Sequence, residues 1–364
     1  MKVILYLGAA VALLRSAAAF LPTDHDNHDD QDQLVFRPAK GINTAANIPG
    51  ASTKHTETEP PPQRFSSDSL QLHDTPSENT PQTPQKSNFT IGSSSSQWAI
   101  TYTPYTDALS CLSASSIRSD VATIARKGFS SIRLYSIDCS ALLHVGHAAR
   151  AHGLKMIIGI HIDENSADTE IQISEITDWA RSNDNDDNTN WDLIELIVVG
   201  NEAIFNSYAS ATALASLITN TRATLRLSGY PGPLTTSEPL SILSAYAHTL
   251  CPTLDLAAAT IQPFFHPSVT PGTAGAYVSA ELARLAAVCP GGLAAVSLES
   301  GWPSRGRANG EAVPGYLEQW VAVAEIVDRA GGRSVVAGFA DEAWRDEGQF
   351  GVEGSWGCGH VFGE

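Results

Sequence analysis

The chain has 364 residues, of which 43% are hydrophobic and 17% are charged, and its formal net charge is -17 at pH 7. A protein this acidic has no basic stripe to neutralise phosphates, which argues against nucleic acid and anionic membrane surfaces as partners. The length allows one large domain or two ordinary ones, and either can bury a full core. We therefore expect a soluble, globular protein that binds a neutral or cationic ligand.

The first residues have the pattern of an export signal. Lys2 precedes an almost wholly apolar run over residues 3–14, and Ala17, Ala18 and Ala19 supply the small residues of a cleavage site. This run falls short of the roughly 20 apolar residues that a membrane-spanning helix needs. We predict a signal peptide over residues 1–19, a secreted protein and no membrane span.

Residues 20–96 are rich in Asp, His, Ser, Thr, Pro and Gln, with scattered apolar side chains. Such a segment cannot bury enough surface to offset the entropy lost on ordering. We predict a disordered, low-complexity stalk whose Ser, Thr and Pro content suits O-glycosylation. Asn88 begins an N-glycosylation sequon within it.

From residue 97 to residue 364, short β-rich runs alternate with segments patterned for helices. Strand starts recur about every 34 residues, which is the repeat of a (β/α)8 TIM barrel. An open doubly wound sheet is the alternative, but no Gly-rich phosphate turn follows the first strand. Polar residues also follow several different strand ends, which favours the barrel. The eight predicted strands are 98–102, 131–135, 155–162, 194–200, 234–237, 256–262, 294–298 and 334–339.

Seven of the eight predicted strands precede a segment able to form a helix. Ser115 can cap the first helix. The last long helix carries apolar residues at the spacing of one helix face. No eighth helix is expected, because residues after Trp344 are Gly-rich and lack apolar periodicity. The spaced residues of the last long helix are Leu317, Trp320, Val321, Ala324 and Val327.

Two glutamates stand at the edge where a barrel places its active site. The fourth strand delivers Asn201 and Glu202, and the seventh delivers Glu299. A carboxyl at the end of a buried strand costs free energy unless its surroundings compensate, so such residues often have a use. Ion pairing with Arg133 or Arg305 accounts equally well for either glutamate alone. The two together favour catalysis.

Four segments carry a resemblance to glycoside hydrolase family 17, the β-1,3-glucanases and related glucanosyltransferases. They are residues 132–139, 198–202, 299–304 and 339–344, and the Glu-Ser-Gly-Trp-Pro sequence that begins at Glu299 is the most specific. The resemblance extends from Ala99 to the C-terminus. The amino-acid sequence of these segments resembles the fungal cell-wall branch of the family, which includes cell-surface glucan 1,3-β-glucosidases, more than the plant branch. The predicted stalk agrees with that branch.

The resemblance implies that residues 97–364 form a catalytic domain that cleaves β-1,3-glucosidic bonds of cell-wall glucan with retention. Glu202 would be the general acid/base and Glu299 the nucleophile. Retaining hydrolysis needs two carboxyls roughly 5 to 5.5 Å apart. We expect partial burial and the negative charge of Glu299 to raise the pKa of Glu202, while hydrogen bonds keep Glu299 ionised.

The sequence leaves the outcome of the reaction open. Attack by water on the glycosyl-enzyme gives hydrolysis, endo or exo, whereas attack by a sugar hydroxyl gives a glucanosyltransferase. A non-catalytic glucan-binding wall protein is a third reading. Retention of both Glu202 and Glu299 argues against it, because a binding module needs no such pair.

Other side chains near the predicted strand ends are candidates for binding substrate. The resemblance assigns Asn201 to the substrate 2-hydroxyl. Arg133 or Tyr135 could hold the nucleophile's carboxylate by charge-assisted hydrogen bonds, and tryptophan faces can stack on pyranose rings. The remaining candidates are Trp302 and Trp344 for stacking and Glu238, Asp341 and Glu342 for sugar hydroxyls.

One departure from the family pattern lies at the end of the sixth strand. Plant members carry tyrosines around a proline there, whereas this chain has Gln262, Pro263, Phe264, Phe265 and then His266. No phenol is available at this point. If a tyrosine normally assists the nucleophile, then Gln262, His266 or Tyr135 must substitute, or the site relies on fewer hydrogen bonds.

No cofactor or metal is expected. His144 and His147 lie on the second predicted helix and His161 ends the third strand, but no third ligand accompanies them. Surface or packing roles suit these histidines better. The expected partner is β-glucan polysaccharide or oligosaccharide, and we expect a monomer in the cell wall.

The five cysteines form no CxxC pair and no zinc-site spacing. An oxidising exterior allows them to pair. Cys111 and Cys139 follow adjacent strands at the top of the barrel, and Cys251 and Cys289 precede adjacent strands at the bottom. We predict these two disulfides, with Cys358 left free or intermolecular.

Overall fold

The computed structural model describes residues 91–93, 97–163, 168–182 and 189–363. The predicted signal peptide and all but three residues of the predicted stalk lie outside this part. The three that are described pack on the domain: Ser93 N donates to Gly332 O at 2.9 Å, and Ile91 contacts the apolar core.

Eight parallel strands form a closed barrel in chain order, and β8 pairs with β1 to close it. The predicted (β/α)8 barrel is therefore confirmed, with each predicted strand present and only its ends shifted. The strands are β1 (Ala99–Thr101), β2 (Ser131–Leu134), β3 (Lys155–Ile160), β4 (Ile194–Asn201), β5 (Leu234–Pro239), β6 (Ala257–Thr260), β7 (Ala295–Ser300) and β8 (Ser334–Val336).

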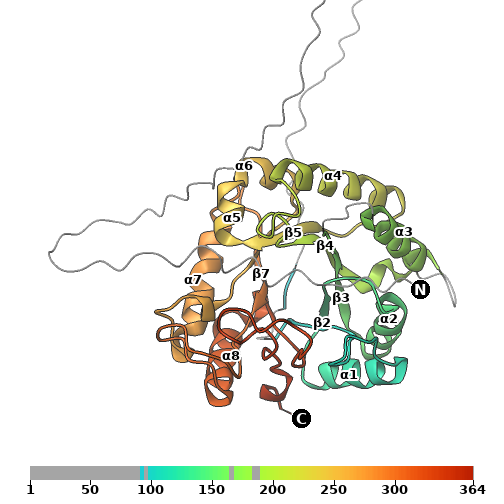
Figure 1. Ribbon diagram of the computed structural model, residues 1–364. Coiled ribbons are helices and arrows are strands. Elements are labelled where there is room, and N and C mark those ends of the chain that lie inside the picture. The colour runs from blue at the N-terminus through green and yellow to red at the C-terminus, as the bar shows by residue number, and fades with distance from the viewer. Residues whose placement is uncertain (1–90, 94–96, 164–167, 183–188, 364) are drawn as a thin grey trace, which may run out of the picture. The chain divides into compact units, whose positions relative to one another are not determined.

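The helices lie outside the ring of strands (Figure 1). Two short helices connect β5 to β6, and a single main helix fills each of the other six connections. After β8 the described chain forms only a short 3-10 turn at Gly359–Val361. As expected from the sequence, no α-helix follows this last strand in the described part of the chain. The helices are α1 (Ala114–Arg126), α2 (Ala141–His152), α3 (Asp168–Arg181), α4 (Ala211–Leu227), α5 (Leu240–Ala245), α6 (Ala247–Leu250), α7 (Ala274–Ala286) and α8 (Tyr316–Ala330).

Two predictions about helices were wrong in detail. The side chain that caps α1 is Ser113, which accepts from Ser116 N, and not Ser115, which lies inside the helix. The apolar spacing predicted for α8 only partly matches its buried face: Leu317 is 69% and Trp320 53% exposed, whereas Val327 packs against the core. The buried face of α8 carries Gln319, Ala322, Val323, Ile326 and Ala330 instead. Small apolar side chains on this second stripe allow close approach to the barrel.

The interior of the barrel is packed with side chains. An apolar cluster inside the ring includes Ile157, Leu196, Val198 and Leu298, all at most 1% exposed. A larger cluster lies between the strands and the helices. The closed, filled barrel leaves the ends of the strands as the places where a ligand can bind.

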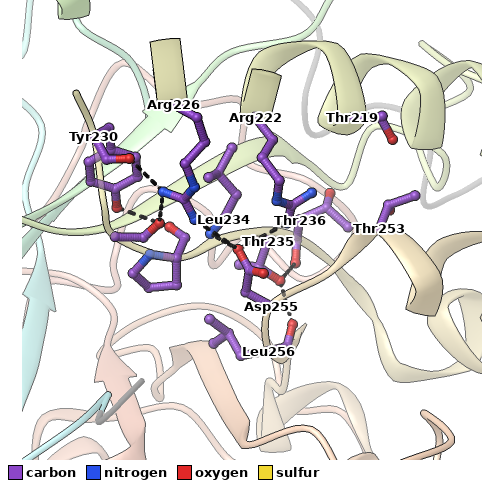
Figure 2. A network of polar contacts seen from close by, with 12 residues as sticks. Thr219, Arg222, Arg226, Tyr230, Leu234, Thr235, Thr236, Thr253, Asp255 and Leu256 are labelled. Atoms are coloured by element: carbon purple, nitrogen blue, oxygen red, sulfur yellow. Dashed lines mark hydrogen bonds and ion pairs between the residues drawn. The ribbon is translucent and has the colours of Figure 1, made fainter. Parts of the chain in front are cut away.

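A polar network ties α4 to the starts of β5 and β6 (Figure 2). Asp255 accepts from Arg222 at 2.9 Å and from the backbone N–H of Leu234 at 2.8 Å. Arg226 lies 3.9 Å from the same carboxylate and donates to the carbonyl of Tyr230. These contacts fix the base of the barrel, opposite the end where the two predicted catalytic glutamates stand.

Both predicted disulfides are confirmed. Cys111 bonds to Cys139 with a Cα–Cα distance of 5.3 Å, and Cys251 bonds to Cys289 with a distance of 5.4 Å. Cys358 is a free thiol, and it is fully buried. No helix within the described ranges is long and apolar enough to cross a membrane.

Candidate active site

A cavity of about 1180 Å³ lies at the C-terminal ends of the strands. Both Glu202 and Glu299 line it, together with strand-end residues such as Thr101 and Thr260. A volume of this size exceeds the usual range for small-molecule pockets and can hold several sugar units.

The Glu299 carboxylate is held from the β2 side. Tyr135 Oη donates to Glu299 Oε1, and Arg133 Nη1 lies 4.0 Å from Oε2. Burial and the negative charge of Glu299 raise the pKa of Tyr135 well above its ordinary value, so the phenol remains a donor. A hydrogen-bond donor and a cation thus stabilise negative charge on Glu299.

Glu202 is contacted from the β5 and β6 side. Its backbone N–H donates to Ser237 O at 2.7 Å, and its side chain is hydrogen-bonded by Thr260. Burial, the charge of Glu299 and the charge of Glu238 raise the pKa of Glu202 from 4.5 to about 8. The group therefore holds a proton at neutral pH.

Thr260 places the two carboxyls side by side. It is the register partner of Glu299 across β6 and β7, and it also hydrogen-bonds Glu202. The expected pair thus lines one cavity at the rim. Tyr135 and Arg133 contact Glu299, whereas burial and neighbouring charges raise the pKa of Glu202. Such contrasting environments suit acid/base chemistry at a glycosidic bond.

Arg133 connects β2 to β4 and β7, the two strands that lead to Glu202 and Glu299. Its side chain is 1% exposed and donates to Asn201 Oδ1 at 2.6 Å and to the carbonyl of Leu298. Because its oxygen is occupied in this way, the Asn201 amide group is left as a donor toward the cavity that Asn201 lines. Of the two ion pairs considered for Glu299, the one with Arg133 is present.

Glu238 lies outside the cavity, although a sugar contact was expected. It is fully buried in β5, and its two carboxylate oxygens accept from the N–H groups of Ile204 at 2.8 Å and Phe205 at 3.2 Å. Burial raises the pKa of Glu238 to about 7. The side chain therefore holds the turn that directly follows Glu202, a residue whose own φ is 53°.

The two candidate tryptophans differ in exposure. Trp302 is fully buried, donates to Val313 O at 2.9 Å and packs edge-on against Phe264, so its faces are not open to a ligand. Trp344 lines the cavity beside Tyr105, with ring centroids 5.8 Å apart.

The two acidic candidates after β8 also differ in their position relative to the cavity. Asp341 lies outside the cavity lining, where it pairs with Arg305 at 3.0 Å and accepts from Gly357 N at 2.8 Å. It thereby fastens the C-terminal segment to the loop after β8. Glu342 lines the cavity and accepts from Thr103 and Arg345.

Sequence reasoning missed several cavity residues that come from loops and from α7. Arg345 lies over the ring of Tyr135 at 6.0 Å, close to the Glu299 contact. Trp356 and Glu353 come from the C-terminal segment, and Tyr277 comes from α7. Of these, only Arg345 had a signal, because it directly follows the segment 339–344 that the resemblance singled out.

Three residues were candidates to contact Glu299 in place of a tyrosine on the sixth strand. Of the three candidates, Tyr135 is the one that donates to Glu299. His266 is exposed and contacts Ser268 at 3.0 Å. Gln262 lines the cavity. Within the described ranges, no group of three or more His, Cys, Asp or Glu side chains is placed to hold a metal ion.

A closed (β/α)8 barrel with two strand-end glutamates in contrasting environments defines the site of a glycoside hydrolase. The sequence agrees: the chain belongs to the BtgE/BtgC glycoside hydrolase domain family, whose model matches residues 99–357.

Fungal relatives extend the match. The chain is 43% identical over 272 residues to a probable beta-glucosidase btgE of Aspergillus fumigatus, covering 74% of this chain and 46% of that protein. A protein of the same name from Emericella nidulans is 37% identical over 273 residues, covering 73% and 47%. The chain thus spans about half the length of the curated relatives it matches.

Solved structures share the fold. An active-site mutant of a β-1,3-glucanosyltransferase from Rhizomucor miehei, in complex with laminaritriose, superposes with a TM-score of 0.60 at 17% identity. That match covers 72% of this chain and 92% of the other. A plant β-glucan endohydrolase gives a TM-score of 0.51 at 18% identity, covering 71% and 95%.

Proposed function

We propose that this domain is a retaining β-glucosidase of the glycoside hydrolase family 17 type, acting on β-1,3-linked glucan. The observation that carries the proposal is the contrast within the glutamate pair. Glu299 receives a hydrogen bond from Tyr135 and faces a buried cation, while the neighbouring Glu202 has a pKa raised to about 8. This division suits a nucleophile and a general acid.

In the first step the Glu299 carboxylate attacks the anomeric carbon. The bond to the leaving oxygen breaks, and Glu202 gives its proton to that oxygen. In the second step the Glu202 carboxylate takes a proton from water. The water oxygen bonds to the anomeric carbon and Glu299 is released, so the β configuration is kept. The Asn201 amide, oriented by Arg133, donates to the sugar 2-hydroxyl.

The choice of substrate rests on the relatives and on the motifs quoted above. The curated relatives are named as probable β-glucosidases, and the Rhizomucor miehei enzyme with the same fold is a β-1,3-glucanosyltransferase. The exposed part of Trp344 provides a stacking surface, and Glu342 provides acceptors for sugar hydroxyls.

We place the protein outside the cell, in the wall. The predicted signal peptide supports export, as do the two disulfides within the described domain. Disulfides form and persist in oxidising compartments. A wall location brings the cavity to its proposed polymer.

Product analysis on laminari-oligosaccharides tests the function. The wild type should give shorter products whose new reducing ends begin in the β configuration, and Glu202→Gln and Glu299→Gln should each abolish them. Glu311→Gln, a substitution on an exposed residue outside the cavity lining, is the matched control and should leave the products unchanged. Turnover that persists in Glu299→Gln, or wild-type protein inactive on every β-glucan, would overturn the proposal.

A further inference from the structure

The two disulfides lie at opposite ends of the barrel and differ in exposure. Cys251 and Cys289, which precede β6 and β7, are only 8% and 3% exposed. Cys111 is exposed and Cys139 is half-buried, and their bond joins the connection after β1 to the connection after β2. Thiol–disulfide exchange depends on the access of an attacking thiolate to the sulfur atoms. The Cys111–Cys139 bond should therefore be reduced before the other one.

The exposed disulfide holds a short hairpin, residues 104–112, at the rim of the cavity. Backbone hydrogen bonds of 2.8 to 2.9 Å and one antiparallel bridge link residues of the hairpin to one another. Its Tyr105 and Leu109 line the cavity, and the Tyr105 ring packs edge-on against Trp344 at 5.8 Å. The disulfide thus anchors a segment that forms part of the cavity wall to the neighbouring loop.

Left-handed backbone is concentrated in the two segments that this disulfide joins. Among the described residues, five other than glycine have a positive φ, and three of them lie here: Leu109 at 57°, Cys139 at 54° and Ser140 at 53°. This conformation costs free energy in a residue with a side chain, and it persists only where the surrounding structure enforces it. Breaking the disulfide removes one such constraint, so the hairpin can relax away from its place on the rim.

We propose that the Cys111–Cys139 disulfide is a redox-sensitive clamp on the cavity, which rests on the proposed function only for the identity of the substrate. The intact clamp keeps Tyr105 of the hairpin beside Trp344, the surface proposed to stack on sugar. A dithiol reductant opens the clamp. The S–S bond between the cysteines breaks and a cyclic disulfide forms in the reductant, whose two protons leave Cys111 and Cys139 as thiols. The hairpin then moves, and the cavity binds its substrate more weakly.

The proposed catalytic groups should not follow this movement. Glu202 directly follows β4 and Glu299 belongs to β7, so both are fixed by the hydrogen-bonded barrel. Tyr135 is held by its hydrogen bond to Glu299 and by the Arg133 guanidinium, 4.7 Å from the centre of its ring. An open clamp should therefore raise KM and leave kcat unchanged. Loss of folded protein has the opposite signature, because it lowers the apparent kcat without changing KM.

Reduction of the native protein tests the clamp without any need for turnover. The protein is treated with dithiothreitol, its free thiols are alkylated, and its peptides are mapped. Cys111 and Cys139 should be alkylated at concentrations of reductant that leave Cys251 linked to Cys289. Hydrogen exchange of this partly reduced protein, measured by mass spectrometry, should be faster in residues 104–112 and unchanged in α7.

Two matched double variants measure the effect on the substrate. In Cys111→Ala/Cys139→Ala the KM for laminaritetraose should rise about three- to tenfold, the effect of losing aromatic contacts in the cavity, with kcat as in the wild type. Cys251→Ala/Cys289→Ala is the control. It should lose thermal stability, because it removes a disulfide of the fold, and should keep the wild-type KM.

The outcomes separate the clamp from the proposed function. A wild type without turnover on any β-glucan overturns the proposed function, and the exchange of residues 104–112 then decides the clamp. Earlier reduction of the Cys251–Cys289 bond, or unchanged exchange in residues 104–112 after reduction, overturns the clamp. An unchanged KM in active Cys111→Ala/Cys139→Ala protein also overturns it, and leaves the proposed function intact.

Discussion

The Arg133 guanidinium lies 4.0 Å from the Glu299 carboxylate, and these side chains are only 1% and 14% exposed. The same guanidinium donates to Asn201 at 2.6 Å. A single buried cation thus faces Glu299, the proposed nucleophile, and contacts the amide beside Glu202, the proposed acid/base. Its charge also lowers the pKa of Glu202, against the larger effects of burial and of the two neighbouring carboxylates.

Replacing Arg133 by Met should destabilise the domain by about 3 kcal/mol, because it leaves a buried carboxylate without its cation. It should also reduce activity, since Asn201 loses the donor that orients it. Urea unfolding and kcat/KM measure the two effects. Arg305→Met is the control: Arg305 is 62% exposed in its pair with Asp341 and should contribute less than about 1 kcal/mol. Equal stability of the two variants would contradict the role given to Arg133.

Tyr135→Phe removes the one phenol that donates to Glu299. A hydrogen bond to a charged group contributes about 1.5 to 3 kcal/mol, so kcat should fall by roughly 10- to 150-fold. The fold should survive, because the ring and its contact with Arg133 remain. Tyr246→Phe, on an exposed tyrosine outside the cavity lining, should have wild-type kcat. If Tyr135→Phe keeps full activity, the nucleophile is held by other groups.

The raised pKa of Glu202 predicts the alkaline side of the pH profile. The general acid must be protonated, so kcat/KM should fall as the pH rises through about 8. Glu299, Glu238 and Arg133 are the charged groups that act on Glu202, and Glu238 raises its pKa. Glu238→Gln removes that negative charge, so the fall should move to lower pH.

If Glu238 had a purely structural role, a different pH profile would be expected for its variants. Loss of the bonds to Ile204 and Phe205 alone would lower stability and overall activity at every pH, without moving the alkaline limb. Glu238→Ala, which also removes both acceptors, should show the shift together with a larger loss of stability. An unmoved limb in both variants would rule out electrostatic coupling to Glu202.

Cys358 should behave as an inert thiol. It is fully buried, and burial raises its pKa to about 12, so it carries little of the reactive thiolate at neutral pH. Peptide mapping after iodoacetamide treatment should find it unlabelled in native protein and labelled after unfolding in urea. Without reduction, the Cys111 peptide should be found linked to the Cys139 peptide, and the Cys251 peptide linked to the Cys289 peptide. Labelling of Cys358 in native protein would contradict its burial.

The strands and the meeting of Glu202 and Glu299 at one cavity could be predicted, because apolar runs such as the one before Asn201 favour buried strands whose ends meet at one rim. The contacts that a side chain makes at the end of a strand could not be predicted from the sequence. Glu238 and Glu299 both occupy the last residues of a strand, yet one points into the wall of the barrel and the other into the cavity. The twist and register of neighbouring strands decide this, and neither is written in local sequence.

Packing also overrode the apolar pattern of α8. Leu317 and Trp320 share an apolar helical spacing but are exposed, and the buried residues of α8 include Ala322 and Ile326 instead. Cavity residues from loops and from α7, such as Trp356 and Tyr277, had no signal at all. Their place depends on contacts made far away in the chain.

Covalent trapping tests the central claim most directly. A 2-deoxy-2-fluoro-β-laminaribiosyl fluoride should react once with the protein and stop, because the 2-fluorine slows both steps while the good fluoride leaving group keeps the first step fast enough for the intermediate to accumulate. Proteolysis and mass spectrometry should then find one added glycosyl group, esterified to Glu299, with none in Glu299→Gln. A label on any other residue, or steady turnover of a laminari-oligosaccharide to α-configured products with no labelled protein, would contradict the assignment of Glu299 as nucleophile.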